Sequence, residues 1–160
     1  MAGRTPRRHE KHAAALGQLL QLTMVLNEDM DQGLARVGLT PSRATLVWEL
    51  LQRGPCTQRV LADALGMSPR NITGLVDALV ETGFVTRAPH PKDRRATLVS
   101  FTDHGADVAA HLEREGAKLA DDLFAAMSDR QFSALVKGFE TLLVRLADLI
   151  AEANERGAAT

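Results

Sequence analysis

The chain has 160 residues and a formal net charge of −1, with 45% hydrophobic and 24% charged residues. This composition is typical of a folded protein with a core, and the absence of a long apolar run predicts that no segment spans a membrane. No apolar stretch follows the basic start of the chain, so we expect no signal peptide. The single cysteine, Cys56, excludes an internal disulfide and favours a cytoplasmic location.

The charge is unevenly distributed along the chain. Residues 1–102 carry 13 Lys and Arg side chains against 9 Asp and Glu, whereas residues 103–160 carry 6 against 11. Binding to DNA phosphates requires a local basic surface rather than a basic protein. The asymmetry is compatible with such a surface, although chance alone could also produce it.

Four helices are predicted in the first half of the chain. Residues 12–34 form one apolar stripe at helical spacing, and residues 1–11 are expected to be a flexible tail. Thr40 and Pro41 start a second helix, Thr57 caps a short third one, and Ser68 and Pro69 open a fourth that lasts to about Thr82. We expect the second helix to bury four side chains, those of Ala44, Val47, Trp48 and Leu51.

The third and fourth helices resemble a helix-turn-helix. Gly66 can adopt the positive φ of a tight turn, and Ala62 is small where two helices would cross. We expect the fourth helix to bury an apolar face made of Ile72, Leu75, Val76, Leu79 and Val80.

The opposite face of the fourth helix carries side chains suited to reading a major groove. Arg70 can bind guanine, Asn71 can bind adenine, and the methyl group of Thr73 can contact thymine. The helix N-terminus, with Ser68 as a further donor, favours a phosphate. A solvated helix face is the alternative. Gly74 indicates either close approach of the backbone to DNA or packing against another helix.

A β-hairpin with a basic tip is predicted next. Residues 84–88 and 97–101 are rich in strand-forming side chains, and residues 89–96 form a polar connection. Lys92, Arg94 and Arg95 lie in that connection, and an arginine there suits the narrow minor groove. Asp93 is expected to orient one neighbouring arginine through a charge-assisted bond, and either arginine could be the one held.

Two long helices complete the chain. Thr102 caps a helix that reaches about Met127, and Ser128 with Gln131 forms a capping box at the start of the last helix. Apolar side chains in the last helix recur every seven residues, which predicts a partner helix. That partner could be the first helix of the same chain, but we favour an interlocked homodimer.

These motifs resemble those of the MarR family of bacterial transcription regulators. The similar stretches are residues 61–68, 73–79, 83–87 and 93–102, followed by Gly105. Two positions depart from the family pattern, since Phe101 replaces a leucine and His90 stands where an aspartate is common. The resemblance implies a mainly α fold: a winged helix-turn-helix at 40–102 with a small β-hairpin wing, and an intertwined helical dimerisation region at 12–34 and 103–153. Residues 154–160 would form a second flexible tail.

The resemblance also implies a function and a set of site residues. A homodimer would bind double-stranded DNA at a pseudo-palindromic operator, usually as a repressor, and a small aromatic or phenolic effector would release it. Ser68, Arg70, Asn71 and Thr73 match the family's major-groove contacts, and Arg94 or Arg95 its minor-groove contact, with Lys92 beside them. Asp77 and Arg87 match an internal ion pair that joins the recognition helix to the wing.

Other side chains do not favour a different activity. His9 and His12, like His104 and His111, lack the accompanying ligands of a metal site, so we expect no metal and no cofactor. We expect no redox role for Cys56, and no catalytic set indicates an enzyme. The main alternative is a winged-helix module that binds protein and not DNA. A ligand-binding or enzymatic helical scaffold is a weaker one.

Overall fold

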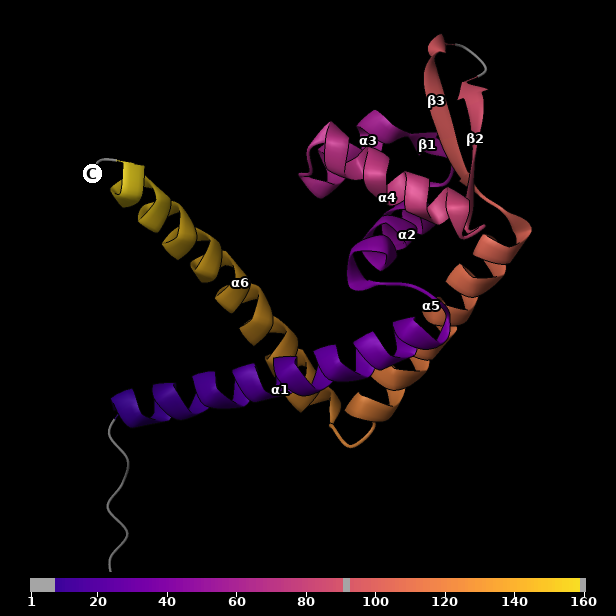
Figure 1. The fold of residues 1–160 in the computed structure, drawn as a ribbon. Helices are drawn as coiled ribbons and strands as arrows, with labels where there is room; N and C mark the ends of the chain where they lie inside the picture. Colours follow the sequence, from indigo (N-terminus) through magenta and orange to yellow (C-terminus); the bar gives the residue numbers. More distant parts are fainter. Residues whose placement is uncertain (1–7, 91–92, 159–160) are drawn as a thin grey trace, which may run out of the picture. The chain divides into compact units, whose positions relative to one another are not determined.

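Helices dominate the structure, a computed structural model that describes residues 8–90 and 93–158, with only the backbone described at residues 90, 93–95 and 158 (Figure 1). The chain divides between His111 and Leu112 into two compact units. The elements in chain order are α1 (Arg8–Arg36), α2 (Pro41–Arg53), β1 (Cys56–Thr57), α3 (Gln58–Leu65), α4 (Pro69–Glu81), β2 (Val85–His90), β3 (Asp93–Phe101), α5 (Asp103–Phe124) and α6 (Asp129–Ala158).

The helix starts predicted from hydroxyl side chains are confirmed. The hydroxyl oxygens of Thr40, Thr57 and Ser68 accept bonds from the backbone N–H three residues ahead, at 3.4, 3.3 and 3.2 Å. Each bond satisfies a backbone donor that has no partner within its helix. Gly66 adopts the left-handed conformation (φ 61°, ψ 28°) that ends α3 and turns the chain into α4.

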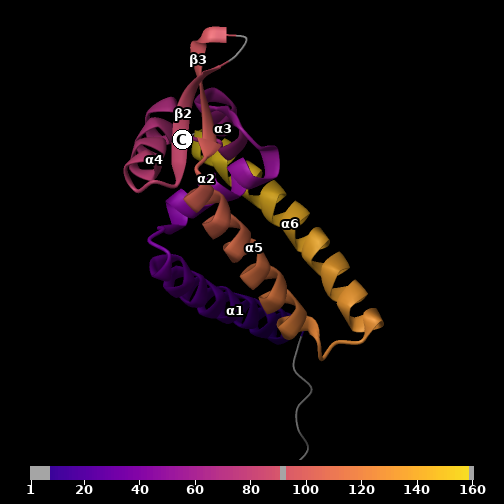
Figure 2. The ribbon, with the colours of Figure 1, turned by 90° about the vertical axis from the view of Figure 1, so that its right-hand side faces the viewer.

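The hairpin is longer than predicted. β2 and β3 pair from Val85 with Phe101 to His90 with Asp93, so much of the predicted polar connection is strand (Figure 2). The predicted connection of residues 89–96 was too long, because Pro89 and His90 belong to β2 and residues 93–96 belong to β3. The sheet order is β1-β3-β2, which makes β2 an edge strand, where a missing backbone N–H is tolerated. The two-residue strand β1 was not predicted, and it pairs with Val99 and Leu98 of β3.

The core of the first unit lies between the helix-turn-helix and the sheet. α4 contributes Ile72, Val76 and Leu79, all fully buried as predicted, but Val80 is 38% exposed and Leu75 is only partly buried. In α2 the prediction was also partly wrong, because Trp48 and Leu51 are partly exposed. The residues that fill the core beside Val47 are Leu46, Leu50, Leu61, Phe84, Val85 and Val99.

A close contact fixes where α5 begins. The Thr102 hydroxyl donates to the carbonyl of Gly83 at 2.6 Å and accepts from the N–H of Gly105 at 3.0 Å. The Thr102 N–H donates to the carbonyl of Phe84 at 3.1 Å. Gly105 is buried against this carbonyl, since a Cβ there would lie 1.8 Å from the Phe84 oxygen. Only glycine allows the start of α5 to approach the start of β2 this closely.

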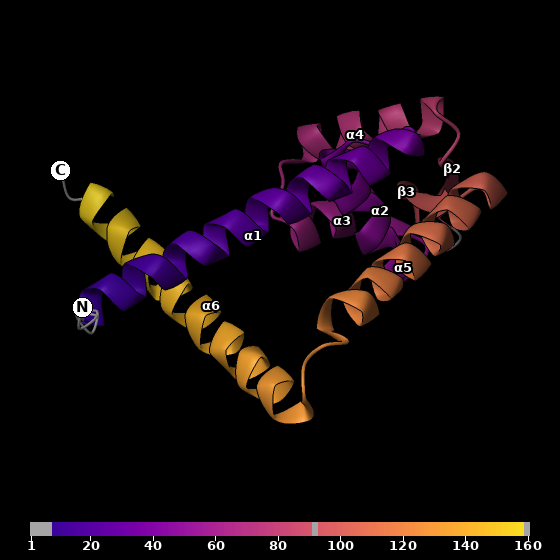
Figure 3. The same ribbon diagram turned by 90° about the horizontal axis from the view of Figure 1, so that it is seen from below.

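The long helices expose much of their apolar surface. α1 is a continuous helix (Figure 3), longer at both ends than predicted, and it exposes Leu20, Met24 and Val25 by 57 to 73%. α6 starts with the predicted capping box, in which the Ser128 N–H donates to Gln131 Oε1 at 3.0 Å. No helix within residues 8–90 and 93–158 has the length and hydropathy of a membrane span.

The Gly105 contact gives a stability prediction. Gly105→Ala should destabilise the protein by about 2–3 kcal/mol, because the new methyl group collides with backbone that cannot move as a side chain would. Urea unfolding of the free protein measures this change. Gly74→Ala is the matched control: a Cβ at Gly74 meets nothing within 4 Å. It should stabilise α4 by up to about 1 kcal/mol. Equal effects of the two substitutions would contradict the contact.

Candidate nucleic-acid interface

The predicted reading residues lie on the exposed side of α4. Arg70, Asn71 and Thr73 are all exposed, and none of them belongs to the buried face of the helix. Ser68 is exposed as well, but its oxygen already accepts the Asn71 N–H, so the group it can offer a phosphate is its O–H. The cap and Pro69 fix the first turn of α4. These side chains therefore project from a rigid helix end.

Gly74 has no packing role among the described residues. A methyl group built at this position meets no atom within 4 Å, so no neighbouring helix requires the glycine. Glycine in a helix interior costs about 1 kcal/mol relative to alanine. Packing within the described part of this chain therefore does not explain Gly74, and close approach of the α4 backbone to DNA stays a prediction.

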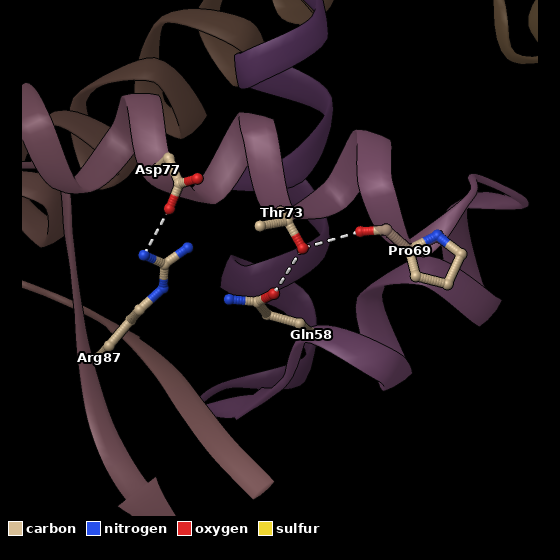
Figure 4. Close-up of polar contacts among 5 residues, drawn as sticks. All are labelled: Gln58, Pro69, Thr73, Asp77 and Arg87. Carbon is tan, nitrogen blue, oxygen red and sulfur yellow. Dashed lines mark hydrogen bonds and ion pairs between the residues drawn. The ribbon is translucent and has the colours of Figure 1, made fainter.

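An ion pair joins α4 to the hairpin. Arg87 Nη1 of β2 lies 2.6 Å from Asp77 Oδ1 of α4 (Figure 4). The Arg87 side chain is 29% exposed and that of Asp77 58%. The structure thus brings together the two residues matched to an internal pair. Because this ion pair is partly solvated, it adds little to the free energy of unfolding. Its main effect is to orient the hairpin relative to α4.

Sequence reasoning missed Gln58, which lies beside this pair. Gln58 is the first residue of α3, and its amide lies between Thr73 of α4 and Arg87 of β2 (Figure 4). The distance from the amide to Thr73 Oγ1 is 3.2 Å. Fifteen residues separate Gln58 from Thr73, so no local spacing predicts the contact.

The described residues cover the hairpin tip only in part. His90 of β2 pairs with Asp93 of β3, and this is the last described pair before the tip. Lys92 lies outside the described residues, and so do the side chains of Asp93, Arg94 and Arg95, whose backbone belongs to β3. The minor-groove role of the arginines and the orienting role of Asp93 therefore stay predictions.

Cys56 is a partly buried thiol of β1. Burial raises its pKa, and nearby Glu49 adds to this effect, while Arg53, which pairs with Glu49, opposes it. The neutral thiol, the less reactive form, is therefore favoured. Within the described part of the chain no three His, Cys, Asp or Glu side chains are grouped so that they could hold a metal ion.

Comparison with known proteins places this geometry in a family. The model of the MarR family matches residues 39–97, which contain the helix-turn-helix and most of the hairpin. An HTH-type transcriptional regulator of Mycobacterium leprae is 30% identical over 112 residues, covering 69% of this chain and 72% of that protein. The chain belongs to the MarR family. YpoP of Bacillus subtilis, another HTH-type transcriptional regulator, is 28% identical over 122 residues, which are 76% of this chain and 83% of YpoP.

Several solved structures, a MarR protein among them, share the fold. The YusO protein of Bacillus subtilis aligns with a TM-score of 0.73 at 17% identity, over 86% of this chain and 98% of YusO. A mutant MarR from E. coli, crystallised with operator DNA, aligns with a TM-score of 0.63 at 22% identity, over 82% and 96%. These comparisons confirm the mainly α winged helix fold. They also confirm a transcriptional regulator rather than an enzyme.

The ion pair gives a prediction about coupling. In a double-mutant cycle of Asp77→Ala and Arg87→Ala, we expect a coupling energy of about 0.5–1 kcal/mol, the range of a partly exposed pair. Unfolding of the four proteins in urea measures it, and DNA affinity should fall in both single variants because the hairpin loses its fixed direction relative to α4. An Asp77→Ala variant with unchanged stability and unchanged DNA affinity would refute this role.

The environment of Cys56 gives a prediction about pH. Because its pKa is raised, iodoacetamide should alkylate the native thiol more slowly at neutral pH than the thiol of the urea-unfolded chain. The alkylation rate of the native protein should approach that of the unfolded chain only at alkaline pH, where the Cys56 thiol ionises in both. Mass spectrometry of timed samples measures the two rates. Faster alkylation of the native protein at neutral pH would indicate an activated thiol instead.

Proposed function

We propose that this MarR family regulator is a homodimer that represses transcription by binding a pseudo-palindromic operator in double-stranded DNA. The main structural support for this proposal is the capped, exposed end of α4. There Arg70 and Asn71 project from a helix that an ion pair between Asp77 and Arg87 joins to the hairpin. A recognition helix of this kind reads base edges in the major groove, while a basic wing follows the neighbouring minor groove. Ser68 and Lys92 would contact phosphates.

The exposed apolar surface supports a dimer. α6 exposes Leu142, Leu143, Leu146 and Ile150 by 53 to 67%, and α1 carries a second such series. Contiguous apolar surface on a water-soluble chain indicates an interface. The seven-residue repeat of α6 is typical of a helix that packs against another helix. A second copy of this chain carries such a helix and can serve as the partner. We therefore propose that residues 12–34 and 103–153 form the dimerisation region and residues 40–102 the DNA-binding region.

Two copies would present two recognition helices to the DNA. A two-fold dimer of winged helices matches two half-sites that lie about one helical turn apart. The E. coli relative crystallised with operator DNA has the same fold, which supports this mode of binding. We propose a small aromatic or phenolic effector that releases the DNA, on the basis of family membership alone. A thermal-shift series with phenolic acids tests it, and no stabilisation by any of them would count against that class.

The proposed reading residues give a prediction about specificity. Arg70→Ala should weaken binding to a selected operator by about 1–3 kcal/mol and relax one base preference, with a smaller effect on random duplexes. Mobility-shift titrations at two salt concentrations measure both affinities, and affinity of the wild type should fall steeply with salt. Arg130→Ala, which removes the same charge from α6, is the matched control and should change neither affinity.

Four results would contradict this proposal in whole or in part. Equal losses on operator and random duplexes would make Arg70 a phosphate contact. The combined Arg94→Ala and Arg95→Ala variant should lose most DNA binding and stay dimeric in sedimentation. Full DNA binding by that variant would show that the wing arginines do not contact DNA. A stable monomer, or no salt-sensitive binding to any duplex, would exclude the function itself.

A further inference from the structure

We infer that Gln58 is a positioning residue for base readout: it holds the Thr73 side chain in one rotamer, so that the methyl group of Thr73 is presented to thymine. The inference rests on the proposed function, because it assigns a task to a residue behind the reading surface. Gln58 is partly buried, whereas Thr73 is exposed. Gln58 therefore acts through Thr73 and does not itself read the DNA.

Hydrogen-bond chemistry decides which way the Gln58 amide faces. The Thr73 hydroxyl donates its one proton to the Pro69 carbonyl at 2.9 Å. If Gln58 turned its oxygen to Thr73, as drawn in Figure 4, that hydroxyl would need a second proton, and the amide N–H groups would face the N–H groups of Arg87. The opposite orientation pairs donors with acceptors on both sides, since the Gln58 nitrogen donates to Thr73 Oγ1 at 3.2 Å and its oxygen faces the N–H groups of Arg87.

The same orientation fixes Arg87. The Gln58 oxygen accepts from Nε and Nη2 of Arg87, both at 3.1 Å, while Nη1 binds Asp77. Three nitrogens of one planar guanidinium are thus held by two partners. A planar group held at three points cannot rotate, so Gln58 is held in turn. With the amide in this orientation, the polar chain runs from Asp77 through Arg87 and Gln58 to Thr73 and joins α4, β2 and α3. Figure 4 shows its two end contacts, Asp77 with Arg87 and Gln58 with Thr73.

The position of Gln58 in the fold makes it a fixed support. It follows Thr57, which both caps α3 and pairs with Leu98 of β3. The backbone at Gln58 is therefore anchored to the sheet and to a helix start at once. A side chain on this support can hold α4 in a fixed place relative to the hairpin.

The bond to Thr73 matters because threonine in a helix has two accessible χ1 rotamers. The bond to Pro69 stabilises one of them, and the added Gln58 donor favours the same one. Both bonds use the hydroxyl, so the methyl group is the part of this exposed side chain that is left to contact a ligand. A methyl group with one fixed direction can recognise the thymine methyl in the major groove.

The experiment compares thymine with deoxyuridine, which lacks only the methyl group. The probe is a duplex that the wild-type dimer selects from a randomised pool, with single thymines replaced in turn. We expect one thymine per half-site whose replacement weakens wild-type binding about fourfold, the effect of losing one buried methyl-sized contact. Thr73→Ser, which keeps the hydroxyl and lacks the methyl, should lose this sensitivity.

The decisive variant is Gln58→Met, which keeps the side-chain length and removes both hydrogen-bonding groups. It should reduce the deoxyuridine effect to about twofold or less, while thermal unfolding and sedimentation verify a folded dimer. Gln52→Met, on the exposed surface of α2, is the matched control and should keep the full effect.

The outcomes separate the inference from the proposed function. If the wild type selects no duplex, the proposed function fails. If it selects an operator but no thymine shows the methyl effect, or if Gln58→Met keeps the full effect, the function stands and the inference about Gln58 is overturned. A poorly folded Gln58→Met variant is replaced by Gln58→Ala, which is judged by the same ratio of affinities.

Discussion

Burial of one face of α4 is the constraint on which the rest of the site depends. Ile72, Val76 and Leu79 are fully buried, and each such side chain contributes about 1.5–3 kcal/mol relative to exposure. Because a helix is rigid, burying these three fixes the direction of every other side chain on α4. Arg70 and Asn71 project outward for that reason, and rotation of the helix to hide them would expose the core.

Apolar burial of Val85 and Val99 anchors the base of the hairpin, and polar contacts add directional links between the hairpin and α4. Asp77, Arg87 and Gln58 join α4 to β2 and α3 through bonds that are directional, whereas hydrophobic contact is not. Behind them, Gly105 lets α5 start directly against the Phe84 carbonyl. A protein that recognises a DNA sequence needs a fixed geometry of this kind, because it contacts base edges and the phosphate backbone at the same time.

The long helices α1 and α6 require a partner that covers their exposed apolar side chains. α1 and α6 carry apolar stripes that the single chain leaves exposed, including Met24 and Leu143. In the proposed dimer the same surface that completes the fold also sets the distance between two recognition helices. Stability of the protomer and spacing of the half-sites would then depend on the same apolar surface.

Features that depend on neighbouring residues could be predicted from the amino-acid sequence. Thr57, Ser68 and Gly66 mark helix ends because capping bonds and positive φ act over three or four residues, and helical spacing identified Ile72 and Leu79 as core. Features that depend on contacts between distant segments could be identified only from the folded structure. Pro89 is accepted in a strand because β2 is at an edge of the sheet, and Val80 stays 38% exposed although helical spacing places it beside Val76. Gln58 meets Thr73 and Arg87 only when two helices and a strand pack together, and no local pattern encodes that meeting.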